Sequence, residues 1–435
     1  MRRFFLLSGV FAAALFAQIS VAPDTPRVIE AFRRIASPDL WPGFTPASTP
    51  VEFFDGTATV LLNHPSPPAG FQPAAGFAVY PGRHDSVHAN TGSKLNGIPT
   101  ATADLSSGKS GPDASAALLV HEAFHVFEAA RYPKWPANET DLFVYPADSA
   151  PLLALRRLET AALVRALAAT DPKEAVCEAG AALTMRARRF GSMPPNAAAY
   201  ERGSELNEGL AQYVEYRSIG KPAALTAEDF PAGHAQARQR AYATGQALAL
   251  LLDRFDPAWK SHLSADPVVP LDELLRKSLG DGASCNITNE ETQAAQARAR
   301  QDVAVFLADI DRRKQEYLGT PGERLELTAG KEPLSPLAFD PWNVVILDAG
   351  LVLHTRWLKL GNRSGSMEIL GRSALTAPAG EHPLFTGVRA MILTGLTDLK
   401  VSQANGKVTV EAQGVKGTFV GTLVNSGGVF RLRLP

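Results

Sequence analysis

The sequence predicts an α+β protein in which a mostly helical segment precedes a segment of β-strands. From Asp113 to about Gly319, apolar residues recur at spacings of three and four, as they do on the buried side of helices. After Gly322 the pattern changes to short apolar or alternating runs separated by Gly, Asn and Asp, which is typical of an all-β sandwich or barrel. We therefore expect three parts: residues 1–22, 23–325 and 326–435.

The first part has the pattern of an export signal. Met1-Arg2-Arg3 carries positive charge, an apolar run from Phe4 to Phe16 follows, and small residues supply cleavage sites after Ala17 or Ala22. The apolar run is shorter than the roughly 20 residues that span a bilayer as a helix. We expect an exported protein, periplasmic or secreted, with no stable membrane insertion once this signal peptide is cleaved.

Composition narrows the classes of partner. The formal net charge is -1 and 20% of residues are charged, so there is no basic excess to bind nucleic acid. The two cysteines, Cys177 and Cys285, could pair after export, but the sequence leaves their pairing open. Partners must be inferred from a site, and the oligomeric state is not predicted.

The predicted elements follow from hydrophobic periodicity and turn residues. Ahead of the helical segment we expect a short helix at 27–36 and a strand at 57–62. The main helices are expected at 114–131, 151–169, 172–190, 197–219, 234–255 and 290–317. The strands of the last part are expected at 344–347, 351–358, 388–393, 408–412, 418–423 and 429–434.

The strongest chemical signal is an H-E-x-x-H pattern within the helix at 114–131. His121 and His125 are four residues apart, so both imidazoles project from one helix face and can reach a single Zn²⁺. Glu122 then lies beside the metal, where it can take a proton from water. Apolar neighbours would bury all three side chains, which is costly without a metal or hydrogen-bond partners. Satisfied core histidines are the alternative interpretation.

A catalytic zinc requires a third protein ligand and an open position. On the helix at 197–219, five polar residues form one stripe: Glu201, Glu205, Glu208, Gln212 and Glu215. Such a stripe is more commonly a solvated helix face. We consider this stripe as a source of the third ligand only because the histidine motif precedes it.

The segment Asn-Glu-Gly-Leu-Ala-Gln-Tyr-Val-Glu-Tyr, at 207–216, resembles the N-E-G-[FL]-A-x-Y-x-E segment of the aminopeptidase N-like gluzincins, which are zinc metallopeptidases. The resemblance implies a zincin-like catalytic domain and makes Glu208 the third zinc ligand, with Glu205 as its nearest competitor. Tyr242-Ala243-Thr244-Gly245-Gln246 is similar to the Y-x-x-G-A motif of the group, so Tyr242 is expected to hydrogen-bond the oxyanion. The resemblance covers roughly 114–263.

Two departures from the family accompany these motifs. Glu208 follows His125 by 83 positions (208 - 125), so the helices at 151–169 and 172–190 are inserted between the two motifs. No G-x-M-E-N segment precedes His121, and residues 90–102 stand there as a candidate edge strand for an extended peptide. Aminopeptidase activity in particular is therefore not predicted.

The sequence thus predicts an exported zinc metallopeptidase that hydrolyses peptide bonds of a peptide or protein substrate through metal-activated water. His121, His125 and Glu208 are expected to hold Zn²⁺, Glu122 to act as general base and Tyr242 to stabilise the oxyanion. Gln212, Glu205 and Glu201 are expected to orient the ligands. The alternatives are an inactive exported metal- or peptide-binding module and a zinc hydrolase of a non-peptide amide or ester.

Overall fold

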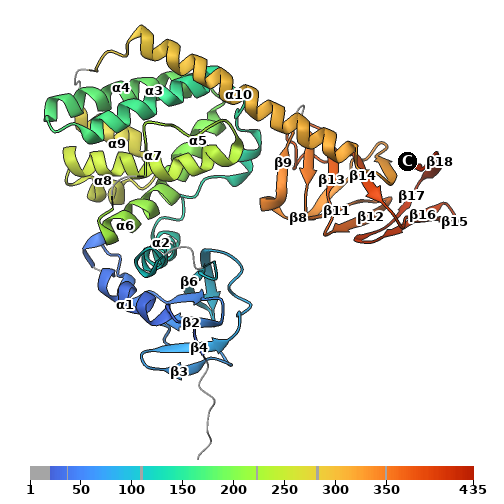
Figure 1. Cartoon of the computed structure of the whole chain (residues 1–435), viewed down its shortest axis with the longest axis horizontal. Helices are drawn as coiled ribbons and strands as arrows, with labels where there is room; N and C mark the ends of the chain where they lie inside the picture. Colours follow the sequence, from blue (N-terminus) through green and yellow to red (C-terminus); the bar gives the residue numbers. More distant parts are fainter. Residues whose placement is uncertain (1–19, 37, 108–110, 222–223, 281–283, 348–349) are drawn as a thin grey trace, which may run out of the picture. The chain divides into compact units, whose positions relative to one another are not determined.

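The computed structural model describes residues 20–36, 38–107, 111–221, 224–280, 284–347 and 350–435. It confirms the α+β class, since these residues form ten α-helices and three β-sheets (Figure 1). Of the predicted export signal, residues 1–19 lie outside the described part. No helix in the described part is both long and apolar enough to span a membrane.

The chain divides into two compact units. Unit 1 comprises Met1–Trp135, Asn207–Ala223 and Pro257–Val268, and unit 2 comprises Pro136–Leu206, Ala224–Asp256 and Val269–Pro435. This division differs from the predicted boundary at 325/326, which falls within the strand β7 (Glu323–Thr328). Helices and the C-terminal strands therefore share unit 2.

Unit 1 is built on a six-stranded sheet with the order β3-β4-β2-β1-β6-β5. Neighbouring strands are antiparallel except β1 and β6, which are parallel. The strands are β1 (Val51–Phe54), β2 (Ala58–Leu62), β3 (Gln72–Ala74), β4 (Phe77–Pro81), β5 (Thr91–Leu95) and β6 (Ile98–Asp104). The sequence predicted β2, and the candidate edge strand within 90–102 corresponds to β5, which lies at one edge of the sheet. The other strands were not predicted, because they are short or rich in polar and turn residues.

The helices of unit 1 are α1 (Thr25–Ile35), α2 (Pro112–Arg131), α6 (Leu210–Ile219) and α8 (Trp259–Ala265). Helix α2 packs against β5, β6, α1 and α6. Pro112 at its first position and Asp113 in its first turn favour helix initiation, and Pro133 follows its end. This central place explains why α2 is apolar around most of its circumference.

An aromatic cluster fixes α2 and α6 within unit 1. Trp41, which is fully buried, makes edge contacts with Phe124 of α2, Tyr213 of α6 and Trp259 of α8, at ring-centroid distances of 5.3, 6.4 and 5.4 Å. Edge-to-face pairs of this kind add about 0.5–1.5 kcal/mol each beyond the burial of their area. The two helices that carry the candidate site are thus held by one shared ring.

Unit 2 begins with a helical part. Its helices are α3 (Ala150–Ala168), α4 (Pro172–Gly191), α5 (Pro195–Ser204), α7 (His234–Phe255), α9 (Leu271–Leu279) and α10 (Asn289–Leu318). A disulfide joins Cys177 of α4 to Cys285, the pairing that the sequence left open. The predicted helices are confirmed to within a few residues at their ends, except that the one expected at 197–219 is not a single α-helix. A π turn, Glu205–Gly209, interrupts it between α5 and α6.

A network of buried arginines and carboxylates forms the polar core of this helical part. Arg186 and Arg189 of α4 and Arg240 of α7 surround Glu159 of α3, and all four are at most 2% exposed. Glu201 bonds Arg189 and Tyr145, and Asp229 bonds Arg156 and Arg240. Every one of these carboxylates has a guanidinium partner, as burial of charge requires.

This network is expected to make the protein unstable in acid. Burial alone would raise the pKa of Glu159, but the charges of Arg186, Arg189 and Arg240 hold it well below its ordinary value, and arginines likewise lower the pKa of Glu201 and Asp229. The native groups stay ionised while the unfolded chain binds protons below about pH 4.5. The contribution of these carboxylates to stability is therefore fully present above that pH. As the pH falls below it, the free energy of unfolding decreases by up to about 1.4 kcal/mol per pH unit for each group.

Urea unfolding between pH 7 and pH 3, followed by circular dichroism, measures this loss. Glu201→Gln should make the pH slope shallower, whereas Glu316→Gln, which removes an exposed partner of Arg312 on α10, should leave it unchanged. A free energy of unfolding that is constant from pH 5 to pH 3 would contradict the account.

The C-terminal strands of unit 2 form two sheets that enclose one apolar core. One sheet has the order β18-β19-β7-β14-β13-β10-β9 and the other β15-β16-β17-β12-β11-β8. Besides β7, the strands are β8 (Ser335–Phe339), β9 (Val344–Ile346), β10 (Val352–His354), β11 (Trp357–Asn362), β12 (Gly365–Leu370), β13 (Ala374–Pro378), β14 (Val388–Leu396), β15 (Lys400–Ala404), β16 (Lys407–Ala412), β17 (Val415–Val420), β18 (Thr422–Ser426) and β19 (Val429–Arg433).

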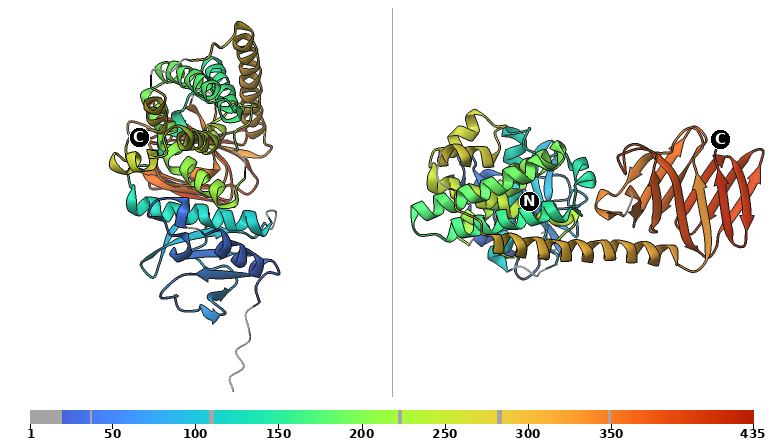
Figure 2. Two further views of the ribbon diagram at one scale, coloured as in Figure 1. Left: turned by 90° about the vertical axis from the view of Figure 1, so that its left-hand side faces the viewer. Right: turned by 90° about the horizontal axis from the view of Figure 1, so that it is seen from above.

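Helix α10 connects the helical part of unit 2 to these sheets (Figure 2). It packs along α3, and Ile310 near its C-terminal end joins a cluster with Leu347, Leu353 and Leu375 of the strand region. The strand predicted at 351–358 is divided, since β10 ends at His354 and β11 begins at Trp357. The arrangement is a sandwich, one of the two forms that the alternating runs predicted.

Candidate metal centre

Three of the predicted site residues converge in unit 1. Nε2 of His125 lies 3.1 Å from Nε2 of His121 and 3.3 Å from Oε2 of Glu208, and Nε2 of His121 lies 3.9 Å from that oxygen. The two imidazoles come from consecutive turns of α2, and Glu208 comes from the π turn that precedes α6. We call His121, His125 and Glu208 the donor cluster. Among the described residues, it is the one group of three or more His, Cys, Asp or Glu side chains whose ligand atoms lie close enough together to share a metal ion.

Carboxylates fix the orientation of both imidazoles. Nδ1 of His121 lies 3.1 Å from Oε2 of Glu215, and Nδ1 of His125 lies 2.9 Å from Oε2 of Glu128. A carboxylate accepts from Nδ1–H, so Nε2 of each imidazole is the nitrogen left to bind a metal ion. The two Nε2 atoms and the Glu208 carboxylate face one another and can share a cation once the imidazoles are deprotonated at Nε2.

The spacing within the donor cluster fits zinc. Two nitrogens and one oxygen that bind Zn²⁺ tetrahedrally at about 2.0–2.2 Å lie roughly 3.3–3.5 Å apart. The separations of 3.1, 3.3 and 3.9 Å bracket that value. Imidazole nitrogen also favours zinc over magnesium or calcium, which prefer oxygen ligands.

Carboxyl groups surround the donor cluster. Four carboxyl groups, those of Glu122, Glu128, Glu208 and Glu215, influence one another and the two imidazoles. Burial raises the pKa of Glu128 to about 8, against the opposing effect of His125. Its Oε1 is buried and has no hydrogen-bond partner among the described residues. A divalent cation bound here would favour the ionised forms of these carboxyl groups.

The pKa values of Glu122 and His125 are shifted from their ordinary values. Burial raises the pKa of Glu122, and the charges of His121 and His125 oppose that shift. Burial lowers the pKa of His125, but hydrogen bonds and charges from Glu128 and Glu208 outweigh it and raise the pKa well above its ordinary value. Without a cation, His125 therefore tends to bind the proton that a metal would displace.

Sequence reasoning missed the contacts of Glu128 and Glu215 with the two imidazoles. Glu215 belongs to the predicted polar stripe but was assigned no contact, and Glu128 follows His125 by three positions on α2, the spacing at which helical side chains meet. The spacing of three between His125 and Glu128 could have predicted this contact from the sequence. Gln212 donates to Oε2 of Glu215 at 3.2 Å, so it helps to hold the carboxylate that contacts His121.

Glu201 and Glu205, which were expected to orient the ligands, bond other groups within unit 2. Arg186 donates to both carboxylate oxygens of Glu205, at 2.7 and 2.6 Å, and Thr244 adds a third bond at 2.7 Å. Glu201 bonds Arg189 and Tyr145. Both carboxylates are therefore committed to the arginine network. Glu208, which belongs to unit 1, lies against the imidazoles.

Tyr242 lies on α7 and is half-buried. It belongs to unit 2, whereas the donor cluster belongs to unit 1, so its role as oxyanion donor stays a prediction. Gln246, which stands where the family motif has alanine, accepts a hydrogen bond from the backbone of Ala224 at 2.7 Å.

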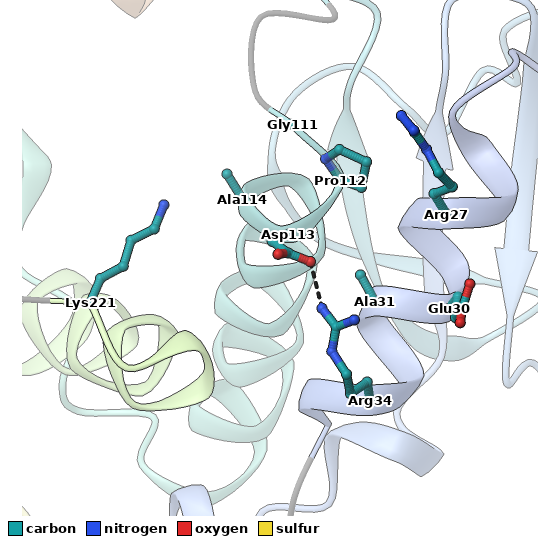
Figure 3. Close-up of a pocket in the computed structure, with 9 residues that line it drawn as sticks. All are labelled: Arg27, Glu30, Ala31, Arg34, Gly111, Pro112, Asp113, Ala114 and Lys221. Atoms are coloured by element: carbon teal, nitrogen blue, oxygen red, sulfur yellow. Dashed lines mark hydrogen bonds and ion pairs between the residues drawn. The ribbon is translucent and has the colours of Figure 1, made fainter.

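A cavity of about 530 Å³ lies elsewhere in unit 1, between α1 and the beginning of α2 (Figure 3). Its lining includes Arg27, Glu30 and Lys221, and an exposed ion pair of 2.5 Å joins Arg34 to Asp113. The lining contains none of the donor residues. This cavity therefore does not extend the candidate metal centre.

Replacing Glu215 by Ala is expected to lower zinc affinity by about 10- to 100-fold, because His121 loses the carboxylate that fixes its tautomer. Gln212→Ala removes only the bond to Glu215 and should cost less. Competition with a chelating dye measures both affinities. An unchanged affinity in Glu215→Ala, or an equal loss in Gln212→Ala, would contradict this assignment.

Comparison with known protein families, curated proteins and solved structures finds no match to this chain. The interpretation of the site therefore depends on its own geometry and on the motifs in the sequence.

Proposed function

We propose that the protein is an exported zinc-dependent peptidase of the gluzincin type, in which His121, His125 and Glu208 hold Zn²⁺. The observation that carries the proposal is the convergence of three lone-pair donors at 3.1, 3.3 and 3.9 Å, with a carboxylate behind each imidazole. Two nitrogens and one oxygen are the donor set of catalytic zinc sites that leave a fourth position open. A fully closed, purely structural site would use four protein ligands.

When bound, zinc supplies Lewis acidity toward a carbonyl and lowers the pKa of water. Glu122 is the residue of this chain suited to move the proton. It follows His121 directly on α2 and is 4% exposed, so its carboxylate is held beside the proposed metal position and away from bulk water. It accepts the proton of the attacking water and returns it to the leaving amine.

An extended peptide is the substrate that the sheet of unit 1 favours. Strand β5 is an edge strand of that sheet, and it packs against α2, the helix that carries both histidines. Gly92 of β5 lies close to Val126 of α2, since a Cβ on Gly92 would be 3.7 Å from that side chain. The free edge of β5 can pair with a peptide backbone along this helix.

Export of the protein is supported by the disulfide between Cys177 and Cys285. Disulfides persist in oxidising compartments and are rare in the cytosol. We therefore propose the periplasm or the extracellular medium as its location.

Cleavage of a peptide library by the purified mature chain tests the function. We expect cleavage that a zinc chelator abolishes and added zinc restores. The same preparation should be offered simple esters and non-peptide amides. Hydrolysis of those compounds without peptide cleavage would favour the non-peptide hydrolase, and zinc binding without any hydrolysis would favour a binding module; either result overturns the proposed peptidase.

A further inference from the structure

Strand β5 directs two of its residues toward helix α2 within unit 1. Successive side chains of a strand point to opposite faces of the sheet, so positions 92 and 94 share one face and position 95 has the other. Gly92 is on the α2 face, since a Cβ there would lie 3.7 Å from Cγ2 of Val126. Leu95 is on the opposite face, where it joins an apolar cluster with residues of β2 and β4. Lys94 therefore lies on the same face as Gly92, the face that α2 covers.

Lys94 is an exposed cation at an open edge of the sheet. Strand β5 is the last in the sheet order, so among the described strands it pairs with β6 alone. Gly92 and Lys94 are both exposed. Within the described part of the chain, the ammonium of Lys94 makes no hydrogen bond or ion pair. Its charge is thus available to a group that approaches this edge.

A peptide that pairs with the open edge of β5 would bring its own side chains into register with Gly92 and Lys94. In an antiparallel pair, directly opposite residues share a face and have Cβ atoms about 4.5–5.5 Å apart. A substrate residue opposite Gly92 would lie beside Val126, which follows His125 directly on α2. A substrate residue opposite Lys94 would lie two positions along the strand, about 7 Å away, on that same face.

The chemistry of these two positions differs. Gly92 has no side chain, and Val126 is half-buried and apolar, so the first position has room for an apolar side chain. The second position places a substrate side chain within reach of the Lys94 ammonium. An acidic side chain is attracted there, whereas a basic one is repelled.

We propose that Lys94 is a specificity-determining residue: it selects substrate peptides that carry Asp or Glu two positions from an apolar residue seated against Val126. This inference rests on the proposed peptidase function and specifies its substrate class. It uses β5 and α2 alone, which both belong to unit 1. A lysine that only protects a sheet edge from aggregation would not discriminate between peptides of opposite charge.

Cleavage of peptides that differ in one charge tests the proposal. In a peptide that the protein hydrolyses, Glu, Gln and Lys are placed in turn at each position around the scissile bond. We expect one position at which kcat/KM is about 3- to 10-fold higher with Glu than with Lys, the size expected when attraction between exposed charges replaces repulsion. The preference should shrink at high salt, because exposed charges are screened.

Lys94→Glu should reverse this preference at the same position. Lys134→Glu is the matched control, because it makes the same change of net charge at an exposed lysine in the turn after α2, away from the sheet. It should keep the wild-type preference. If Lys94→Glu does not fold, Lys94→Gln takes its place and should remove the preference. Equal rates with Glu and Lys at every position, a preference unchanged in the Lys94 variant, or the same reversal in Lys134→Glu would overturn the role of Lys94.

Binding of the same peptides to the full-length Glu122→Gln chain, measured by fluorescence anisotropy, separates this proposal from the proposed function. Tighter binding of the Glu peptide, reversed when Lys94→Glu is added, supports the role of Lys94 even if the wild type hydrolyses nothing, and in that case the peptidase proposal alone is wrong. Hydrolysis by the wild type with no charge preference in either assay would overturn the role of Lys94 and leave the peptidase in place.

Discussion

Replacing Glu122 by Gln is expected to abolish peptide hydrolysis while zinc stays bound. The amide has the size of the carboxylate but cannot accept a proton at neutral pH, and the loss of a general base typically costs about 100- to 10,000-fold in rate. None of the three proposed metal donors is changed. Turnover of a cleaved peptide and the zinc content of the same sample measure the two effects.

Asp113→Asn is the matched control for that variant. It also removes a carboxylate from α2, but Asp113 is exposed and pairs with Arg34 in the first turn of the helix. Its turnover should equal that of the wild type. If Glu122→Gln hydrolyses peptides at the wild-type rate, the proposed role of Glu122 is wrong.

Glu208→Ala is expected to lose most of the affinity for zinc and all hydrolytic activity. The change removes the oxygen that lies 3.3 Å from Nε2 of His125 and leaves two nitrogen donors. The loss of affinity should exceed the roughly 10- to 100-fold that an indirect partner contributes. Titration with zinc in the presence of a competing chelator gives the affinity.

The order of two variants makes this second prediction specific. Glu208→Ala should bind zinc more weakly than Glu205→Gln, and Glu201→Gln should bind it normally. The reverse order of the first two would mean that Glu205 is the third ligand, and that the resemblance to the aminopeptidase segment misassigns the glutamate at this position.

Much of the helical architecture could be predicted because its signals are local. The helix around His121 and His125 has a proline at its first position and apolar residues around most of its circumference, and these features depend on neighbouring residues alone. The H-E-x-x-H spacing likewise places two imidazoles on one face. The donor set of the candidate site was therefore within reach of sequence reasoning.

The sheet of unit 1 was largely missed because its strands lack a clear period of two. In β1, Glu52 interrupts an otherwise apolar run, yet it is fully buried. Ser86 donates to its carboxylate at 2.5 Å, and His84 lies 3.0 Å from its other oxygen. Those partners are more than 30 positions away in the sequence, so no local pattern identifies Glu52 as an interior residue.

The polar stripe of Glu201, Glu205 and Glu208 failed as a guide for a related reason. Helical periodicity treats the three residues alike, because it assumes an uninterrupted α-helix. A π turn interrupts that helix at Glu205–Gly209, and Glu205 and Glu201 bond Arg186 and Arg189, which come from another helix. Such partners become visible when the chain is folded.

The zinc content of the wild-type chain, measured by elemental analysis after equilibration with buffered zinc, tests the central claim most directly. We predict one zinc ion per chain in the wild type and none retained in a variant that carries both His121→Ala and His125→Ala. Wild-type protein without zinc, or one zinc ion per chain retained by the double variant, would contradict the assignment of His121, His125 and Glu208 as a metal centre.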